Sequence, residues 1–143
     1  MKHIVVPVDG SEQAARAALF AAQLASPHGA QITLLFVYDA PAAVSKGLAG
    51  LAGAEGLAEA SRASADAAFG AALAVMADVV ESEPEQTLVV GSPAVEIITF
   101  TERSAVDLVV MGSRGMSSME GLVMGSVSER VMRGARCPVT IVR

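Results

Sequence analysis

The stretch LVVMGSRG, Leu108–Gly115, joins a continuous run of apolar residues to a loop with two glycines three positions apart. After nine intervening residues, Gly125-Ser126 precedes a helix-like segment, Val127–Ala135. A glycine at the end of a buried strand lets a ligand approach the backbone, because no Cβ lies in the way. A Gly-Ser pair at the start of a helix offers N–H groups and the positive end of the helix dipole. The pattern therefore predicts a cradle for phosphate groups.

The apolar run before the first glycine is one of five strand-like runs in the chain. Most of these runs are continuously apolar, which is typical of strands covered on both faces in a parallel sheet. The predicted strands are Ile4–Asp9, Gln31–Tyr38, Gln86–Val90, Asp107–Met111 and Val139–Val142.

Segments with helical spacing separate these strands. The first covers Ser11 to Ser26 with Ser11 as N-cap, and the second covers Leu57 to Val80. The third starts at Ser92-Pro93, with proline at the first helical position, and the fourth starts at Ser126. This alternation predicts an α/β fold: a Rossmann-like, doubly wound, five-stranded parallel sheet with helices on both faces. The length indicates a single domain, residues 1–143.

In open sheets of this kind, ligands bind beyond the carboxyl ends of the strands at the point where the strand order reverses. Asp9 ends the first predicted strand and Gly112 follows the fourth. If these two strands are neighbours, both residues face one crevice.

The composition of the chain argues against some classes of binding partner. The net charge is −5, which disfavours a nucleic-acid partner. No run approaches the ~18 apolar residues of a membrane span, so no membrane partner is expected, and the N-terminal stretch reaches a charge too early for a signal peptide. With a single cysteine, Cys137, no internal disulfide is possible. These features predict a cytoplasmic protein.

The whole chain resembles the universal stress protein family. The resemblance is carried by Gly-x-x-Gly, nine residues and Gly-Ser, together with IVVPVDGS (4–11), VVGSPA (89–94) and CPVTIVR (137–143). Within that family the complete glycine pattern marks the members that bind ATP. The resemblance therefore implies an adenine nucleotide as ligand, together with Mg²⁺, and leaves open whether ATP, ADP, AMP or a cyclic nucleotide is physiological.

The resemblance also implies which residues bind the nucleotide. Pro7, Val8 and Asp9 at the end of the first predicted strand would line the adenosine side, Val37 would lie against adenine, and the start of the last helix would contact phosphates. With the residues proposed on their own chemistry, the complete candidate set is Pro7, Val8, Asp9, Val37, Met111, Gly112, Arg114, Gly115, Gly125, Ser126, Val127 and Ser128.

Several of these residues have a simpler interpretation. The glycines at 112 and 115 suit a turn that needs glycine φ angles. Asp9 could hold ribose hydroxyls or a Mg²⁺ ion, or form a turn before Gly10. Arg114 could lie near the phosphates or be a solvated loop arginine. Ser126 and Glu129 also fit a capping box with Ser126 as N-cap.

No catalytic constellation is visible, and neither histidine, His3 or His28, neighbours the glycines. We therefore expect a regulatory, ATP-binding stress-response protein with unknown protein clients, and at most weak ATPase activity. One alternative is a nucleotide-independent dimeric interaction module. Another is an enzyme of the related ATP-pyrophosphatase class.

The last predicted strand ends at the C-terminus, where an edge strand could pair with a second chain. The resemblance implies a homodimer through Val139, Thr140, Ile141 and Val142. Glycine also recurs every third residue within segment 42–56, which is interpreted as a flexible connection or as a lid over bound nucleotide.

Overall fold

A computed structural model describes residues 1–40, 53–115 and 124–143, and its strands form one parallel sheet in the order β3-β2-β1-β4-β5. The prediction of a five-stranded, doubly wound parallel sheet is confirmed. The strands are β1 (His3–Pro7), β2 (Gln31–Tyr38), β3 (Glu85–Val90), β4 (Leu108–Gly112) and β5 (Val139–Val142).

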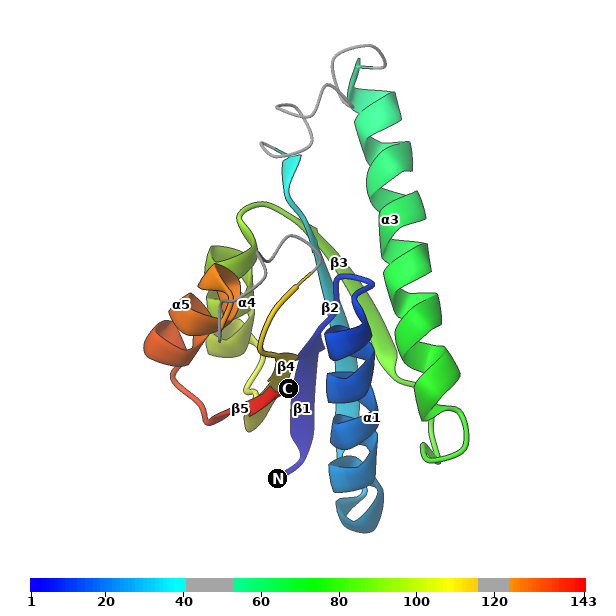
Figure 1. Ribbon diagram of the computed structural model, residues 1–143, viewed down its shortest axis with the longest axis vertical. Coiled ribbons are helices and arrows are strands. Elements are labelled where there is room, and N and C mark those ends of the chain that lie inside the picture. Colours follow the sequence, from blue (N-terminus) through cyan, green and yellow to red (C-terminus); the bar gives the residue numbers. More distant parts are fainter. Residues whose placement is uncertain (41–52, 116–123) are drawn as a thin grey trace.

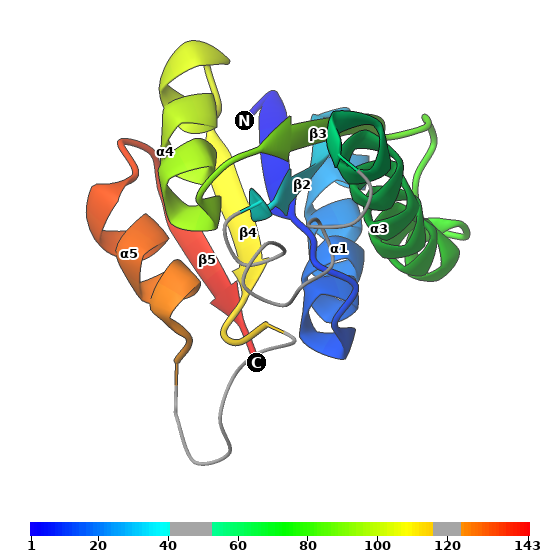
Figure 2. The same cartoon turned by 90° about the horizontal axis from the view of Figure 1, so that it is seen from above.

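The described helices form a layer on each face of the sheet (Figures 1 and 2). One layer holds α1 and α3, which contact each other, and the other holds α4 and α5. A short 3-10 helix, η1, follows α1. The bounds are α1 (Glu12–Ala25), η1 (Ser26–His28), α3 (Gly53–Met76), α4 (Pro93–Arg103) and α5 (Ser126–Gly134).

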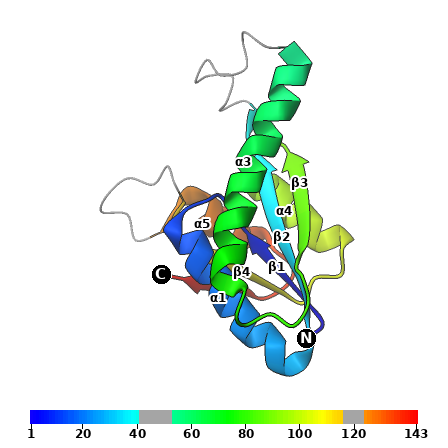
Figure 3. The same ribbon diagram turned by 90° about the vertical axis from the view of Figure 1, so that its right-hand side faces the viewer.

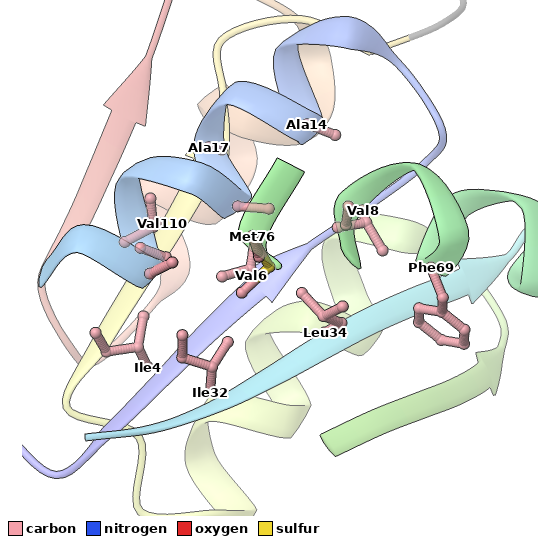
Figure 4. Packing of buried hydrophobic residues seen from close by; sticks show 14 of the residues in the cluster. Ile4, Val6, Val8, Ala14, Ala17, Ile32, Leu34, Phe69, Met76 and Val110 are labelled. Atoms are coloured by element: carbon pink, nitrogen blue, oxygen red, sulfur yellow. The ribbon is translucent and has the colours of Figure 1, made fainter. Parts of the chain in front are cut away.

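The two helix layers cover different sets of strand side chains. On the α1 and α3 side, the core holds Ile4, Val6, Leu34 and Val110, all fully buried (Figure 4). The side of α1 that faces them is built from alanines, six of which are buried. Because alanine has no side chain beyond Cβ, the helix can lie close against the sheet. The α4 and α5 side covers the alternate strand positions, including Val5 and Val109.

The strand order places β1 between β2 and β4, so the sheet reverses its winding at the β1–β4 pair. The register pairs Val5 with Val109 and Pro7 with Leu35. Since all strands are parallel, the carboxyl ends of β1 and β4 lie at one edge. This is the neighbour relation on which the predicted crevice depends, and it is confirmed.

Contacts at the opposite edge hold the start of the chain. The backbone N–H groups of Lys2 and His3 donate to Asp107 Oδ2, and these bonds lower the pKa of that carboxyl. The ring of His3 lies within hydrogen-bond distance of the Ser104 carbonyl, at 3.1 Å, and of Thr33 Oγ1, at 2.8 Å. His3 therefore has a structural role.

The long helix α3, which faces the viewer in Figure 3, begins and ends four residues earlier than predicted. The N–H groups of Val79 and Val80 both donate to the Met76 carbonyl, forming a turn that ends the helix. Residues 53–56 belong to the first turn of α3 and not to a connection, because strong helix formers surround Gly56. The remainder of segment 42–56 lies outside the described residues.

The described residues, with their gaps at 41–52 and 116–123, include no helix long and apolar enough to span a membrane.

Candidate functional site

The first glycine of the motif lies where β4 meets helix α1. A Cβ built on Gly112 would lie 3.0 Å from Gln13 Cβ and 3.1 Å from the Gln13 carbonyl carbon. Part of this contact is with backbone, which cannot move aside as a flexible side chain can. Glycine at 112 therefore allows the end of β4 to pack directly on the helix.

The second glycine of the motif lies against Asp9, and a Cβ on Gly115 would overlap Asp9 Oδ2. The other carboxylate oxygen, Oδ1, accepts a hydrogen bond of 2.9 Å from Ser11 N–H. Gly10, between them, has a φ of 84°, which favours glycine. Asp9 therefore does form the predicted turn. The same geometry places its second oxygen beside the glycine loop, so the two interpretations are compatible.

Left-handed backbone does not explain the three motif glycines. The described glycines with positive φ are Gly10, Gly29, Gly53 and Gly91. Gly112, Gly115 and Gly125 are outside this set, and Gly125 has a φ of −80°. The interpretation as a turn that needs glycine φ angles is therefore wrong for Gly112 and Gly115. Gly112 and Gly115 are instead explained by the close approach of Gln13 and Asp9 to their backbone.

Helix α5 begins one residue earlier than the capping-box interpretation requires. Its N-cap is Gly125, whose carbonyl accepts a 3.0 Å hydrogen bond from Glu129 N–H. Ser126 is the first helical residue and is exposed, so the prediction of Ser126 as N-cap is wrong. Glu129 is in an ion pair with Arg133, at 2.7 Å. Helix capping therefore does not explain the presence of serine at position 126.

The two halves of the motif meet at Ser113, which is buried. Its carbonyl accepts hydrogen bonds from Gly125 N–H, at 2.7 Å, and from Ser128 Oγ, at 2.8 Å. Its own N–H donates to the Val142 carbonyl, at 2.8 Å. Ser113 thus joins the end of β4 to the start of α5 and to β5. This role was not predictable from the sequence, because the bonds to α5 and β5 span twelve or more residues.

Ser128 is buried, and its hydroxyl lies 2.8 Å from the Ser113 carbonyl and 2.9 Å from the Gly125 carbonyl. One hydroxyl proton is shared between these acceptors. The hydroxyl therefore holds the first turn of α5 to the loop, and phosphate contact by Ser128 stays a prediction.

Four residues predicted for the adenosine side lie near the carboxyl ends of β1, β2 and β4. Val37 and Met111 belong to the apolar cluster under α4 and α5. Extending the β1–β4 register by two residues places Pro7 beside Met111. Val8 instead points into the core under α1 and α3 (Figure 4) and is 4% exposed, so its side chain faces away from Val37 and Met111. Any ligand contact by Val8 would come from its backbone.

Two features complete the geometry of the site. Arg114 is half-buried, and its N–H donates to Gln13 Oε1 at 2.8 Å. No group of three or more His, Cys, Asp or Glu side chains that could hold a metal ion occurs in the described part of the chain. A Mg²⁺ ion at Asp9 would therefore need water and phosphate oxygens to complete its coordination.

A separate cavity of about 270 Å³ lies far from the glycine motif, near the amino ends of the strands. Gly29, Ala30 and Ile32 line it from the start of β2, and Val80 to Ser82 line it from the turn after α3. Because open α/β sheets bind ligands at the carboxyl edge, we assign the site by the motif and the fold, not by this cavity.

Comparisons with known proteins agree with the fold. A sequence profile described as the universal stress protein family matches residues 1–143. A universal stress protein of Methanocaldococcus jannaschii is 33% identical over 142 residues, which cover 99% of this chain and 82% of the relative.

Solved structures resemble this chain over almost its whole length. Universal stress protein UspA from Lactobacillus plantarum has a TM-score of 0.78 and 27% identity, with 99% of this chain and 97% of that chain covered. A universal stress protein in complex with cAMP has a TM-score of 0.67 and 26% identity, covering 99% and 96%. The protein from Archaeoglobus fulgidus in complex with dAMP has a TM-score of 0.68 and 25% identity, covering 100% and 98%. On the profile match and the identity to its relatives, the chain belongs to the universal stress protein family.

Proposed function

We propose that this protein binds an adenine nucleotide, ATP in the first instance, at the carboxyl edge of β1 and β4. The observation that carries the proposal is the 2.7 Å hydrogen bond from Gly125 N–H to the Ser113 carbonyl. It joins the glycine loop after β4 to the amino end of α5, at the place where the sheet reverses its winding. Such an edge is where open α/β sheets bind ligands, and helix N-termini favour phosphate.

Two family members of known structure support the choice of ligand class. One is described in complex with cAMP and the other in complex with dAMP, and both share adenine and a phosphate. In this chain Val37 and Met111 would take the adenosine side. Gly112, Gly115, Gly125 and Ser126 would take the phosphates, with Val127, Ser128 and the Arg114 guanidinium beside them.

The proposed role is regulatory. Nucleotide occupancy would change how this cytoplasmic protein, a single domain, interacts with protein clients in a stress response. Mg²⁺ bound by Asp9 and phosphate oxygens would neutralise phosphate charge, and hydrolysis, where it occurs, would be slow. The observation that favours binding over catalysis is that the Asp9 carboxylate beside the loop also accepts the Ser11 N–H and so holds the turn.

The substitution Gly125→Ala should weaken ATP binding while leaving the fold intact. The φ of −80° and ψ of 157° at this residue suit alanine, and an added Cβ would make ordinary 3.4 Å contacts with Arg114 Cα and the Ser113 carbonyl. That Cβ would lie between the two halves of the phosphate cradle. We expect ATP binding, measured by isothermal titration, to weaken about tenfold, with a change in stability of under about 1 kcal/mol.

The matched control for that experiment is Ser104→Ala, at the C-cap of α4 away from the site. It should leave ATP affinity unchanged. Gly125→Ala protein that binds ATP as tightly as the wild type would show that the glycine is not part of a phosphate site. The interaction-module alternative would then be favoured.

We further propose a homodimer through β5. The strand lies at the edge of the sheet, and all four of its residues, Val139–Val142, are half-buried. An apolar edge of this kind invites pairing with a second chain. Sedimentation velocity at low micromolar concentration should give a species of twice the 14.5 kDa chain mass. A single 14.5 kDa species at every concentration would contradict the dimer.

A further inference from the structure

Gln13, on the first turn of α1, touches the glycine loop with both its backbone and its side chain. Its Cβ and carbonyl carbon lie under Gly112, as described above. Its side-chain oxygen Oε1 accepts hydrogen bonds from Ser113 Oγ, at 3.0 Å, and from Arg114 N–H, at 2.8 Å. One side chain thus holds the two residues that separate Gly112 from Gly115.

Chemistry fixes which end of the Gln13 amide faces the loop. A backbone N–H can only donate, so the atom opposite Arg114 N–H has to be the amide oxygen. The Ser113 hydroxyl then donates to the same oxygen. Gln13 acts here as a double acceptor, and an apolar side chain of the same size could replace neither bond.

The bond to Arg114 holds the loop one residue beyond Ser113. Ser113 is already held through its own backbone by Val142 and Gly125. Arg114 N–H is the next backbone donor along the chain, and it points to Gln13 and therefore toward α1. This bond orients the peptide group of Arg114, and the next residue, Gly115, lies against Asp9.

We infer that Gln13 is a positioning residue of the phosphate loop: it sets the path of Ser113 and Arg114 without touching the ligand itself. The inference rests on the proposed function, because it assumes that the loop binds phosphate. The segment between β1 and the first turn of α1 contacts the loop at two points. Asp9 lies against Gly115, and Gln13 binds Ser113 and Arg114. The role of Gln13 was not predictable from the sequence, because nothing in the spacing near residue 13 signals a contact 100 residues away.

The test compares Gln13→Met, Gln13→Glu and the control Gln23→Met, an exposed glutamine on the same helix. Each protein is titrated with ATP and with adenosine, and the exchange rate of the Arg114 amide is measured by NMR without ligand. Gln13→Met should bind ATP about tenfold more weakly, the factor expected for one net hydrogen bond. Its adenosine affinity should stay within about twofold, because adenosine has no phosphate to position.

Hydrogen exchange of the Arg114 amide shows whether Gln13 acts by positioning the loop or by a general effect on the structure. The Arg114 amide should exchange about tenfold faster in Gln13→Met. It should return to the wild-type rate in Gln13→Glu, whose carboxylate keeps the acceptor. Gln23→Met should match the wild type in every measurement.

Two results would overturn the inference alone: wild-type ATP affinity in Gln13→Met, or equal losses for ATP and adenosine. A wild-type protein that binds neither ligand would instead overturn the proposed function, and with it any role of Gln13 toward phosphate.

Discussion

Gly115→Val is expected to weaken ATP binding about a hundredfold, which corresponds to roughly 2.7 kcal/mol of binding free energy. The new Cβ would overlap Asp9 Oδ2, and Asp9 is held in its turn by the 2.9 Å bond from Ser11 N–H. Either the carboxylate or the loop has to move away from its wild-type position. Both groups belong to the proposed nucleotide site, so their displacement weakens ATP binding.

The fold should tolerate this change, because Gly115 is exposed and is not among the described glycines with positive φ. The midpoint of thermal unfolding should fall by no more than about 3 °C. Gly70→Val is the matched control, since that glycine is exposed on α3 with nothing within 4 Å of a built Cβ. Equal ATP affinity in Gly115→Val and Gly70→Val would refute the assignment of the site.

Leu34→Ala is expected to have the opposite effect to Gly115→Val: it should greatly lower the stability of the fold and change ATP affinity little. Leu34 is fully buried on β2, the strand between β1 and β3 (Figure 4). Removing its side chain leaves a cavity and should lower the free energy of unfolding by about 3 kcal/mol. The midpoint of thermal unfolding should fall by about 10 °C.

Val75→Ala is the control for this variant, because Val75 is 40% exposed on α3. It should change the free energy of unfolding by less than about 0.5 kcal/mol. Leu34→Ala protein that is still folded should bind ATP within about threefold of the wild type. A loss of ATP affinity as large as that of Gly115→Val would show that the site and the core cannot be separated.

Periodicity was enough to place the strands to within two residues at either end. The β2 and β5 bounds agree with the prediction, because buried parallel strands are continuously apolar and begin and end abruptly in the sequence. The position of Asp9 and Gly112 at one edge also follows from fold rules once β1 and β4 are neighbours.

Contacts between distant segments were not predictable in this way. The reason for glycine at 112 is the backbone of Gln13, and the reason at 115 is the Asp9 carboxylate. Local sequence suggested a turn instead, because turns are the commonest local use of glycine. The capping-box pattern at Ser126 failed for a related reason: Gly125 N–H bonds to Ser113, and this tertiary contact fixes where the helix starts.

The central claim is that the glycine loop and the start of α5 form a nucleotide site. Isothermal titration of the nucleotide-free, wild-type protein with ATP and Mg²⁺ tests it most directly. The account predicts saturable binding with one nucleotide per chain, which Gly115→Val weakens about a hundredfold. No detectable binding of ATP, ADP, AMP or cAMP at millimolar concentration, by protein that unfolds cooperatively, would contradict it.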